Sequence, residues 1–120
     1  MSLSIAHFPP EQRDQQVIDA ICRFREDEGE TLIVRRTEAE RNHLTFTFPC
    51  RKITLHVHSS LDAVGFLARI ATELAQHGIS TNCVSAWYHD HLFVPAAQGL
   101  AAVRVLRELQ SRYRQELRQA

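Results

Sequence analysis

The stretch that decides the fold is residues 62–79, DAVGFLARIATELAQHGI, which has the pattern of an amphipathic helix. Its apolar residues recur at helical spacing, and they are Val64, Leu67, Ala68, Ala71, Leu74 and Ala75. Asp62 suits the N-cap, because its carboxylate can accept hydrogen bonds from the free N–H groups of the first turn. Gly78 suits the end of the helix, because glycine readily adopts the left-handed conformation that is common there.

Strand patterns lie on both sides of this helix. Residues 52–58 alternate between apolar and polar side chains, which is typical of a half-buried strand. Residues 79–88 are rich in β-forming residues, His89-Asp90 is the predicted turn, and residues 91–94 return as a third strand that ends at Pro95. A long amphipathic helix is predicted over residues 98–117, so this half has the order β-α-β-β-α.

The first half of the chain shows a weaker version of the same order. Strands are predicted over residues 2–8, 20–25, 31–35 and 44–48, and an acidic turn with Gly29 joins the second to the third. Residues 11–19 are a short helix or a loop, and Thr37 caps a short helix over residues 38–42. We therefore interpret the chain as an α+β protein with two β-α-β-β-α units in tandem. Residues 1–49 form the shortened, degenerate unit, and residues 50–120 form the second.

The second unit lacks one element of a complete ferredoxin-like unit, which has a final strand after its second helix. It is expected to borrow an edge strand from the first half or from another chain, or to leave that edge open. Open sheet edges pair readily, so a homodimer is expected.

Composition excludes several classes of protein. A hydrophobic share of 44% in 120 residues allows a packed core without metals or disulfides. Fourteen basic residues balance fourteen acidic ones, which argues against bulk electrostatic binding to nucleic acid or to an anionic membrane. Cys22, Cys50 and Cys83 fit neither a disulfide framework nor a zinc motif. No signal peptide or membrane-spanning apolar run is recognisable, so a cytoplasmic location is expected.

Residues 62–79 resemble the start of an ACT domain, whose usual pattern is Asp-x-x-Gly-Leu-Leu-x-x-Ile followed by Ala-x-x-Gly-Ile. The residues in register are Asp62, Gly65, Leu67, Ile70, Ala75, Gly78 and Ile79, while Phe66 replaces a leucine and Val64 stands where proline is common. The segments ITLHVHSSLDAVGF and NCVSAWYHDHLFVP resemble short bacterial ACT-like proteins of uncharacterised function. SAWYHDHLFVP is also similar to a segment of cytosolic arginine sensors, with matches at Ser85, Asp90, Val94 and Pro95.

This resemblance implies a ferredoxin-like ACT fold, with an antiparallel sheet and its helices on one face. It implies a regulatory module that binds an amino acid or related metabolite, acts through the pairing of modules or subunits, and serves an unidentified protein target. The ligand is expected at the turn before the first helix, against the second strand of a neighbouring module. The candidate ligand-binding residues are Asp62, Ala63, Val64, Gly65, Phe66, Asn82, Val84, Ser85 and Asp90. The alternative is a ligand-free module for protein–protein interaction and assembly.

Catalytic, cofactor and metal sites are not predicted. The sequence has no Gly-rich phosphate loop and no Gly-x-Ser-x-Gly motif, so we expect neither an enzyme nor a cofactor. His56 and His58 share a strand face, but a tight His89-Asp90-His91 turn is not expected to direct both imidazoles inward, so no metal is predicted. A basic stripe lies on the last helix, at Arg104, Arg107, Arg114 and Arg118. No strand carries the aromatic pattern that stacks RNA bases, so nucleic acid is not expected as a partner.

Overall fold

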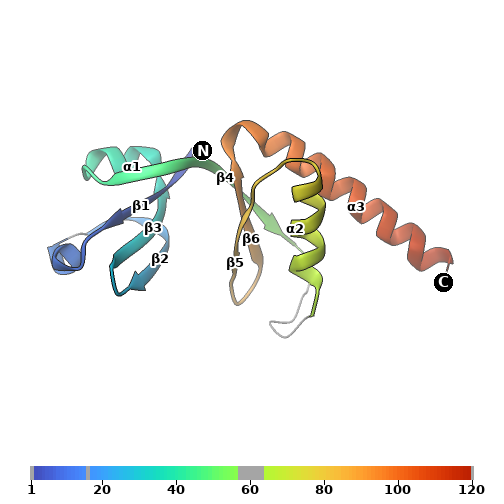
Figure 1. Ribbon diagram of the computed structural model, residues 1–120, viewed down its shortest axis with the longest axis horizontal. Helices are drawn as coiled ribbons and strands as arrows, with labels where there is room; N and C mark the ends of the chain where they lie inside the picture. Colours follow the sequence, from blue (N-terminus) through green and yellow to red (C-terminus); the bar gives the residue numbers. More distant parts are fainter. Residues whose placement is uncertain (1, 16, 57–63, 120) are drawn as a thin grey trace. The chain divides into compact units, whose positions relative to one another are not determined.

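The protein is described here by a computed structural model that covers residues 2–15, 17–56 and 64–119. The chain divides into two compact units, Met1–Cys50 and Arg51–Ala120. In each unit a strand, a helix, two consecutive strands and a second helix follow one another, which is the order of a ferredoxin-like fold (Figure 1). The predicted α+β, ferredoxin-like class is therefore confirmed.

The first unit is a four-stranded antiparallel sheet with the strand order β2-β3-β1-β4. Its elements are β1 (Leu3–Phe8), the 3-10 helix η1 (Pro10–Gln15), β2 (Ala20–Glu26), β3 (Gly29–Arg35), α1 (Arg36–Arg41) and the first part of β4 (Thr45–Leu55). One face of this sheet carries the core of the unit, formed by Ala6, Phe8, Leu32, Val34, Ala39 and Leu44. Residues 11–19, predicted as a short helix or a loop, contain the 3-10 helix η1 as far as Gln15, and α1 begins one residue before the Thr37 that was expected to cap it.

Strand β4 corrects the prediction of two separate strands, at residues 44–48 and 52–58. It runs without interruption through Pro49 and ends at Leu55, while Val57 and His58 lie outside the described residues. The register against β1 changes by one residue between the pairs Leu3–Cys50 and Ile5–Thr47, and Phe48 has a φ of 55°. This is a β-bulge, where the missing N–H of proline breaks no regular ladder bond.

The second unit has the strand order β4-β6-β5, with two helices packed on one face of the sheet. Its further elements are α2 (Phe66–Gln76), β5 (Asn82–Ser85), β6 (Asp90–Pro95), the 3-10 helix η2 (Ala96–Gln98) and α3 (Gly99–Gln119). The core is formed by Ile70, Leu74, Ile79, Leu92, Val94, Ala102, Val105 and Leu109. The described part of this unit contains no strand after α3. Strand β4 serves both as the last strand of the first unit and as the first strand of the second.

The two ends of α2 illustrate a wrong prediction and a confirmed one. The helix begins at Phe66 with Gly65 as its N-cap, so Asp62 is not the N-cap and lies outside the described residues. The C-terminal end follows the prediction, because Gly78 has a left-handed φ of 71°. The N–H of Gly78 donates to Ala75 O and that of Ile79 to Leu74 O, at 2.9 and 3.0 Å, which is a Schellman motif.

The hairpin between β5 and β6 turns earlier than predicted. Ser85 pairs with Asp90, and Ala86 N donates to His89 O at 3.0 Å, so the turn is centred on Trp87 and Tyr88. His89-Asp90 therefore belongs to the returning arm of the hairpin and is not the turn itself. Strand β5 is also shorter than the predicted residues 79–88.

Candidate functional site

The start of α2 places backbone N–H groups beside a glycine. Gly65 has φ 85° and ψ −8°, and the side chain before it, Val64, is 99% exposed. The first intrahelical bond runs from Arg69 N to Gly65 O at 3.0 Å, so the N–H groups of residues 66–68 precede the helical ladder. Gly65 has no side chain with which to cap them. A helix N-terminus of this kind favours the binding of an anionic group.

The described atoms leave space beside Gly65. A Cβ atom built there would meet no described heavy atom within 4 Å, apart from its chain neighbours. The positive φ of 85° nevertheless makes any other residue strained at this position. A bulky replacement at Gly65 would therefore mix a folding defect with any loss of ligand, and it is unsuitable as a test of binding.

The candidate residues of the β5–β6 hairpin lie on opposite faces of the sheet. Ser85 and Asp90 are opposite each other, on the face that carries the core residue Leu92. Asp90 is 7% exposed, and its charge adds to burial in raising the pKa of the neighbouring Cys83 thiol. Asn82 and Val84 lie on the other face, because side chains alternate along a strand. The structure therefore brings Ser85 and Asp90 together, but it does not bring Asn82 to them. Asp62 and Ala63 lie outside the described residues.

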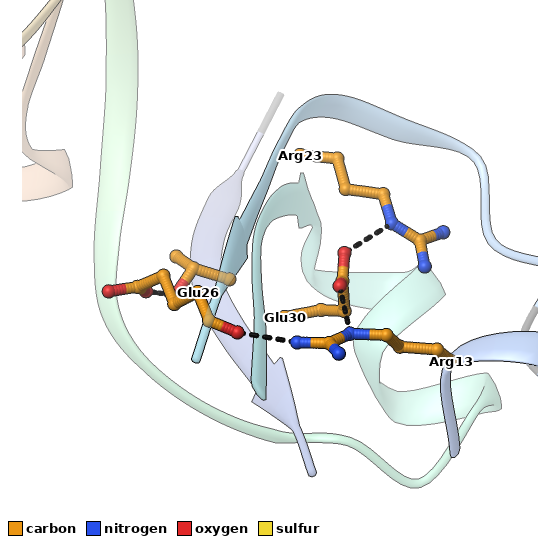
Figure 2. A network of polar contacts seen from close by, with 5 residues as sticks. Arg13, Arg23, Glu26 and Glu30 are labelled. Atoms are coloured by element: carbon orange, nitrogen blue, oxygen red, sulfur yellow. Dashed lines mark hydrogen bonds and ion pairs between the residues drawn. The ribbon is translucent and has the colours of Figure 1, made fainter. Parts of the chain in front are cut away.

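The corresponding turn of the first unit, after β1, is filled by charged side chains of its own. Figure 2 shows the Glu30 carboxylate between the guanidinium groups of Arg13 and Arg23. The N–O distances are 2.5 and 2.8 Å, and the Glu30 side chain is 4% exposed. Arg13 also donates to the Glu26 carbonyl oxygen, and Arg23 lies 5.4 Å from the centroid of the Phe8 ring. These contacts tie η1 to the sheet, where the second unit instead packs a full helix.

The hydrogen bond from Arg23 holds the pKa of the Glu30 carboxyl below its usual value of 4.5, and Arg13 adds to this effect, against the opposing effect of burial. A lowered pKa means that the folded chain favours the ionised carboxylate. Its contribution to stability is therefore present above pH 4.5 and is lost as the pH falls through the lowered pKa.

Three histidines of the second unit gather in a group that the sequence analysis did not predict. The ring centroids of His56 and His89 are 4.8 Å apart, and those of His89 and His91 are 6.3 Å apart. His91 Nδ1 lies 3.0 Å from the Thr54 hydroxyl, which joins β4 to β6. The prediction of a turn at His89-Asp90 was wrong, because the turn is at Trp87 and Tyr88 and His89 lies on the returning arm. Histidines two residues apart in an extended arm share a face.

A surface depression and the length and polarity of the helices both bear on function. Between α2 and α3 lies a depression lined by Glu73, His77, Arg107, Glu108, Ser111 and Arg112. Arg112, which is not part of the basic stripe, forms an ion pair with Glu73 there. No helix in the described part of the chain combines the length and the apolar character needed to cross a membrane.

Comparisons with known proteins agree with this geometry. Two models of the ACT domain match the chain, one over residues 46–108 and the other over residues 6–51. A crystal structure from Vibrio cholerae, of a protein of unknown function described as a possible transport protein, is 36% identical, with a TM-score of 0.79 over 89% of this chain and 82% of that one. A crystal structure from Agobacterium tumefaciens shares the fold at 16% identity, with a TM-score of 0.71 over 89% of this chain and 81% of that one. None of the curated proteins matches the sequence.

Proposed function

Because the chain belongs to the ACT-domain family, whose members are generally regulatory modules that bind small molecules, we propose that it senses an amino acid or a related metabolite. The observation that carries the proposal is the start of α2, where the described atoms leave space beside Gly65 and the N–H groups of residues 66–68 precede the helical ladder. The carboxylate of the ligand accepts hydrogen bonds from this turn. The amino group needs an acceptor, and the Asp90 carboxylate supplies it.

We propose that a second copy of the chain completes the site. β5 is the last strand in the order β4-β6-β5, so no described strand of its own unit lies beside one of its edges. Asn82 and Ser85 are exposed on this strand, one on each face, and both can contact a ligand held at a partner's Gly65 turn. Ligand and interface would then share residues, so binding would shift the equilibrium between paired and unpaired chains and signal to a target protein. The proposed location is the cytoplasm.

A module that assembles with another protein and binds no ligand is the second candidate. The observation that favours it is the tip of the β5–β6 hairpin, where Trp87 and Tyr88 are 81% and 82% exposed. Exposed aromatic side chains are enriched among the residues that dominate protein interfaces.

The oligomeric state distinguishes these two functions. A sensor whose ligand lies between subunits should change its monomer–dimer equilibrium when the ligand is added, and sedimentation velocity measures this change directly. A dimer that is unaffected by every amino acid, and that is lost in a Trp87→Ala Tyr88→Ala variant, would support the assembly module instead.

Replacing Asp90 by alanine should weaken binding of the amino acid about ten- to a hundred-fold. This corresponds to the loss of a hydrogen bond to a charged group, on the order of 1.5–3 kcal/mol. A thermal-shift screen against the amino acids first identifies the ligand, because a molecule that binds the folded chain raises its apparent stability. Calorimetric titration then compares wild type with the variant.

Asp27→Ala is the matched control, since Asp27 is an exposed carboxylate in the first unit. Circular dichroism should show that both variants retain the fold. Equal affinities for wild type, Asp90→Ala and Asp27→Ala would remove Asp90 from the site, and an absence of any thermal shift would contradict the sensor function itself.

A further inference from the structure

The three clustered histidines lie on the side of the second unit that faces away from its helices. Leu92 and Val94 of β6 point into the core beneath α2 and α3. Side chains alternate along the strand, so His91 points to the opposite face. Thr54, whose hydroxyl lies 3.0 Å from His91 Nδ1, brings β4 to the same place, and His56 directly follows the last residue of that strand. His56 is exposed and the other two are half-buried, so a solute can reach them.

Among the described residues, most of the charged groups that shift the pKa of His91 are basic. The pKa of His91 is lowered from its usual 6.5, first by burial and then by the charges of Lys52, His89 and His56. The charge of Asp90 raises the pKa of His91, but the Asp90 side chain lies on the face of the sheet that the helices cover. Lys52 shares the face of Thr54, since side chains alternate along β4, and His56 follows the end of the same strand. Protonated imidazoles here would repel one another and Lys52.

The sign of the pH dependence follows from this shift. A lowered pKa means that the folded chain disfavours the charged imidazole, so the contribution of His91 to stability is present above pH 6.5 and is lost as the pH falls. An anion bound to the cluster would reverse this loss of stability, because its negative charge compensates the positive charge of the protonated imidazole. By linkage, protonation must then strengthen the binding of that anion.

We propose that His56, His89 and His91 form a proton-dependent binding site for a small oxyanion, such as the phosphate or carboxylate group of a metabolite. Each imidazolium donates an N–H to an anion oxygen, and hydrogen bonds between two charged groups are the stronger kind. Thr54 and Lys52 supply further donors. This site is separate from the Gly65 turn and does not depend on the proposed amino-acid site.

A metal site is the obvious rival for three neighbouring histidines. No group of three or more His, Cys, Asp or Glu side chains among the described residues is placed to hold a metal ion. The Thr54 hydroxyl also engages Nδ1 of His91, one of the two nitrogens that could ligate a metal. The excess of positive charge, with Lys52 nearby, favours an anion over a cation.

Sulfate is the probe of choice, because it keeps its double charge throughout the relevant pH range. Histidine resonances are followed by NMR between pH 7.5 and 5.5, with sulfate, acetate or chloride added at matched ionic strength. Sulfate should raise the pKa of His91, and its affinity should increase up to about tenfold per pH unit for each proton coupled to binding. His7 and His43, which are exposed in the first unit, serve as internal controls that should not respond. A response to acetate equal to that for sulfate would assign the site to carboxylates, and a response to sulfate alone would assign it to phosphate-like dianions.

The variants His56→Gln and His89→Gln test the cluster directly, and His7→Gln is the matched control. Each cluster variant should lose most of the pH-dependent sulfate binding while keeping the fold. His56 is exposed, so its replacement should be tolerated even if the half-buried His89 is not. Sulfate binding that is absent, independent of pH or unchanged in His56→Gln would overturn the proposal. Stoichiometric zinc in protein purified without added metal would overturn it as well.

Discussion

Replacing Gly29 with alanine should lower the free energy of unfolding by about 2–6 kcal/mol, through a backbone clash together with conformational strain. A Cβ atom at this position would lie 2.4 Å from the carbonyl oxygen of Phe8 and 3.3 Å from its carbonyl carbon. Gly29 also has a φ of 154°, a backbone angle that residues with a side chain rarely adopt. The neighbour is backbone, so it cannot rotate away, and β3 would have to move from β1. Urea denaturation followed by circular dichroism measures the loss.

The matched control for this change is Gly78→Ala. Gly78 has a φ of 71°, but a Cβ there would meet no described heavy atom within 4 Å apart from its chain neighbours. Only the cost of a left-handed residue is then expected, about 1–2 kcal/mol. A loss at Gly29 no larger than that at Gly78 would mean that the close approach of Phe8 is absent in solution. A genuine clash should also disturb the adjacent Glu30 and its pairs with Arg13 and Arg23.

Replacing Leu74 with alanine should destabilise the second unit by about 2–5 kcal/mol, as is typical when a large side chain is removed from a packed core. Leu74 is completely buried, in the core that joins α2 and α3 to the sheet. The removed atoms leave a cavity, because the strands β4 and β6 behind α2 cannot collapse fully into it. Denaturation in urea gives the difference in stability, and hydrogen exchange should locate the weakened protection in α2 and α3.

Leu100→Ala is the control for this prediction. It makes the same chemical change on α3, at a side chain that is 78% exposed, so the expected effect lies within about 0.5 kcal/mol. Similar losses at the two positions would show that α2 does not pack as described. Because α2 also carries the Gly65 turn, Leu74→Ala should reduce the thermal shift produced by any ligand that binds there.

The strongest sequence predictions concern features that depend on neighbours along the chain. The apolar spacing of residues 66–76 and 99–119 belongs to helices, and the left-handed glycine at position 78 ends the first of them. The hairpin with Gly29 was likewise predicted from local residues. Hydrophobic periodicity and glycine conformation act within one or two turns of chain, so a single sequence is enough to predict them. The fold was predicted from the ACT motif, because the residues of that motif occur at fixed spacing in the sequence.

Only the tertiary structure determined the features that depend on contacts between segments far apart in the sequence. Pro49 ends a strand in a local interpretation, yet β4 continues through it because pairing with β1 absorbs an extra residue in a bulge. The location of the turn at Trp87 and Tyr88 was settled by the pairing of Ser85 with Asp90. The histidine cluster needs β4 beside β6, and the Glu30 pairs need η1 beside β2 and β3. Strand register and side-chain convergence arise from contacts between segments far apart in sequence, and no pattern within one segment encodes those contacts.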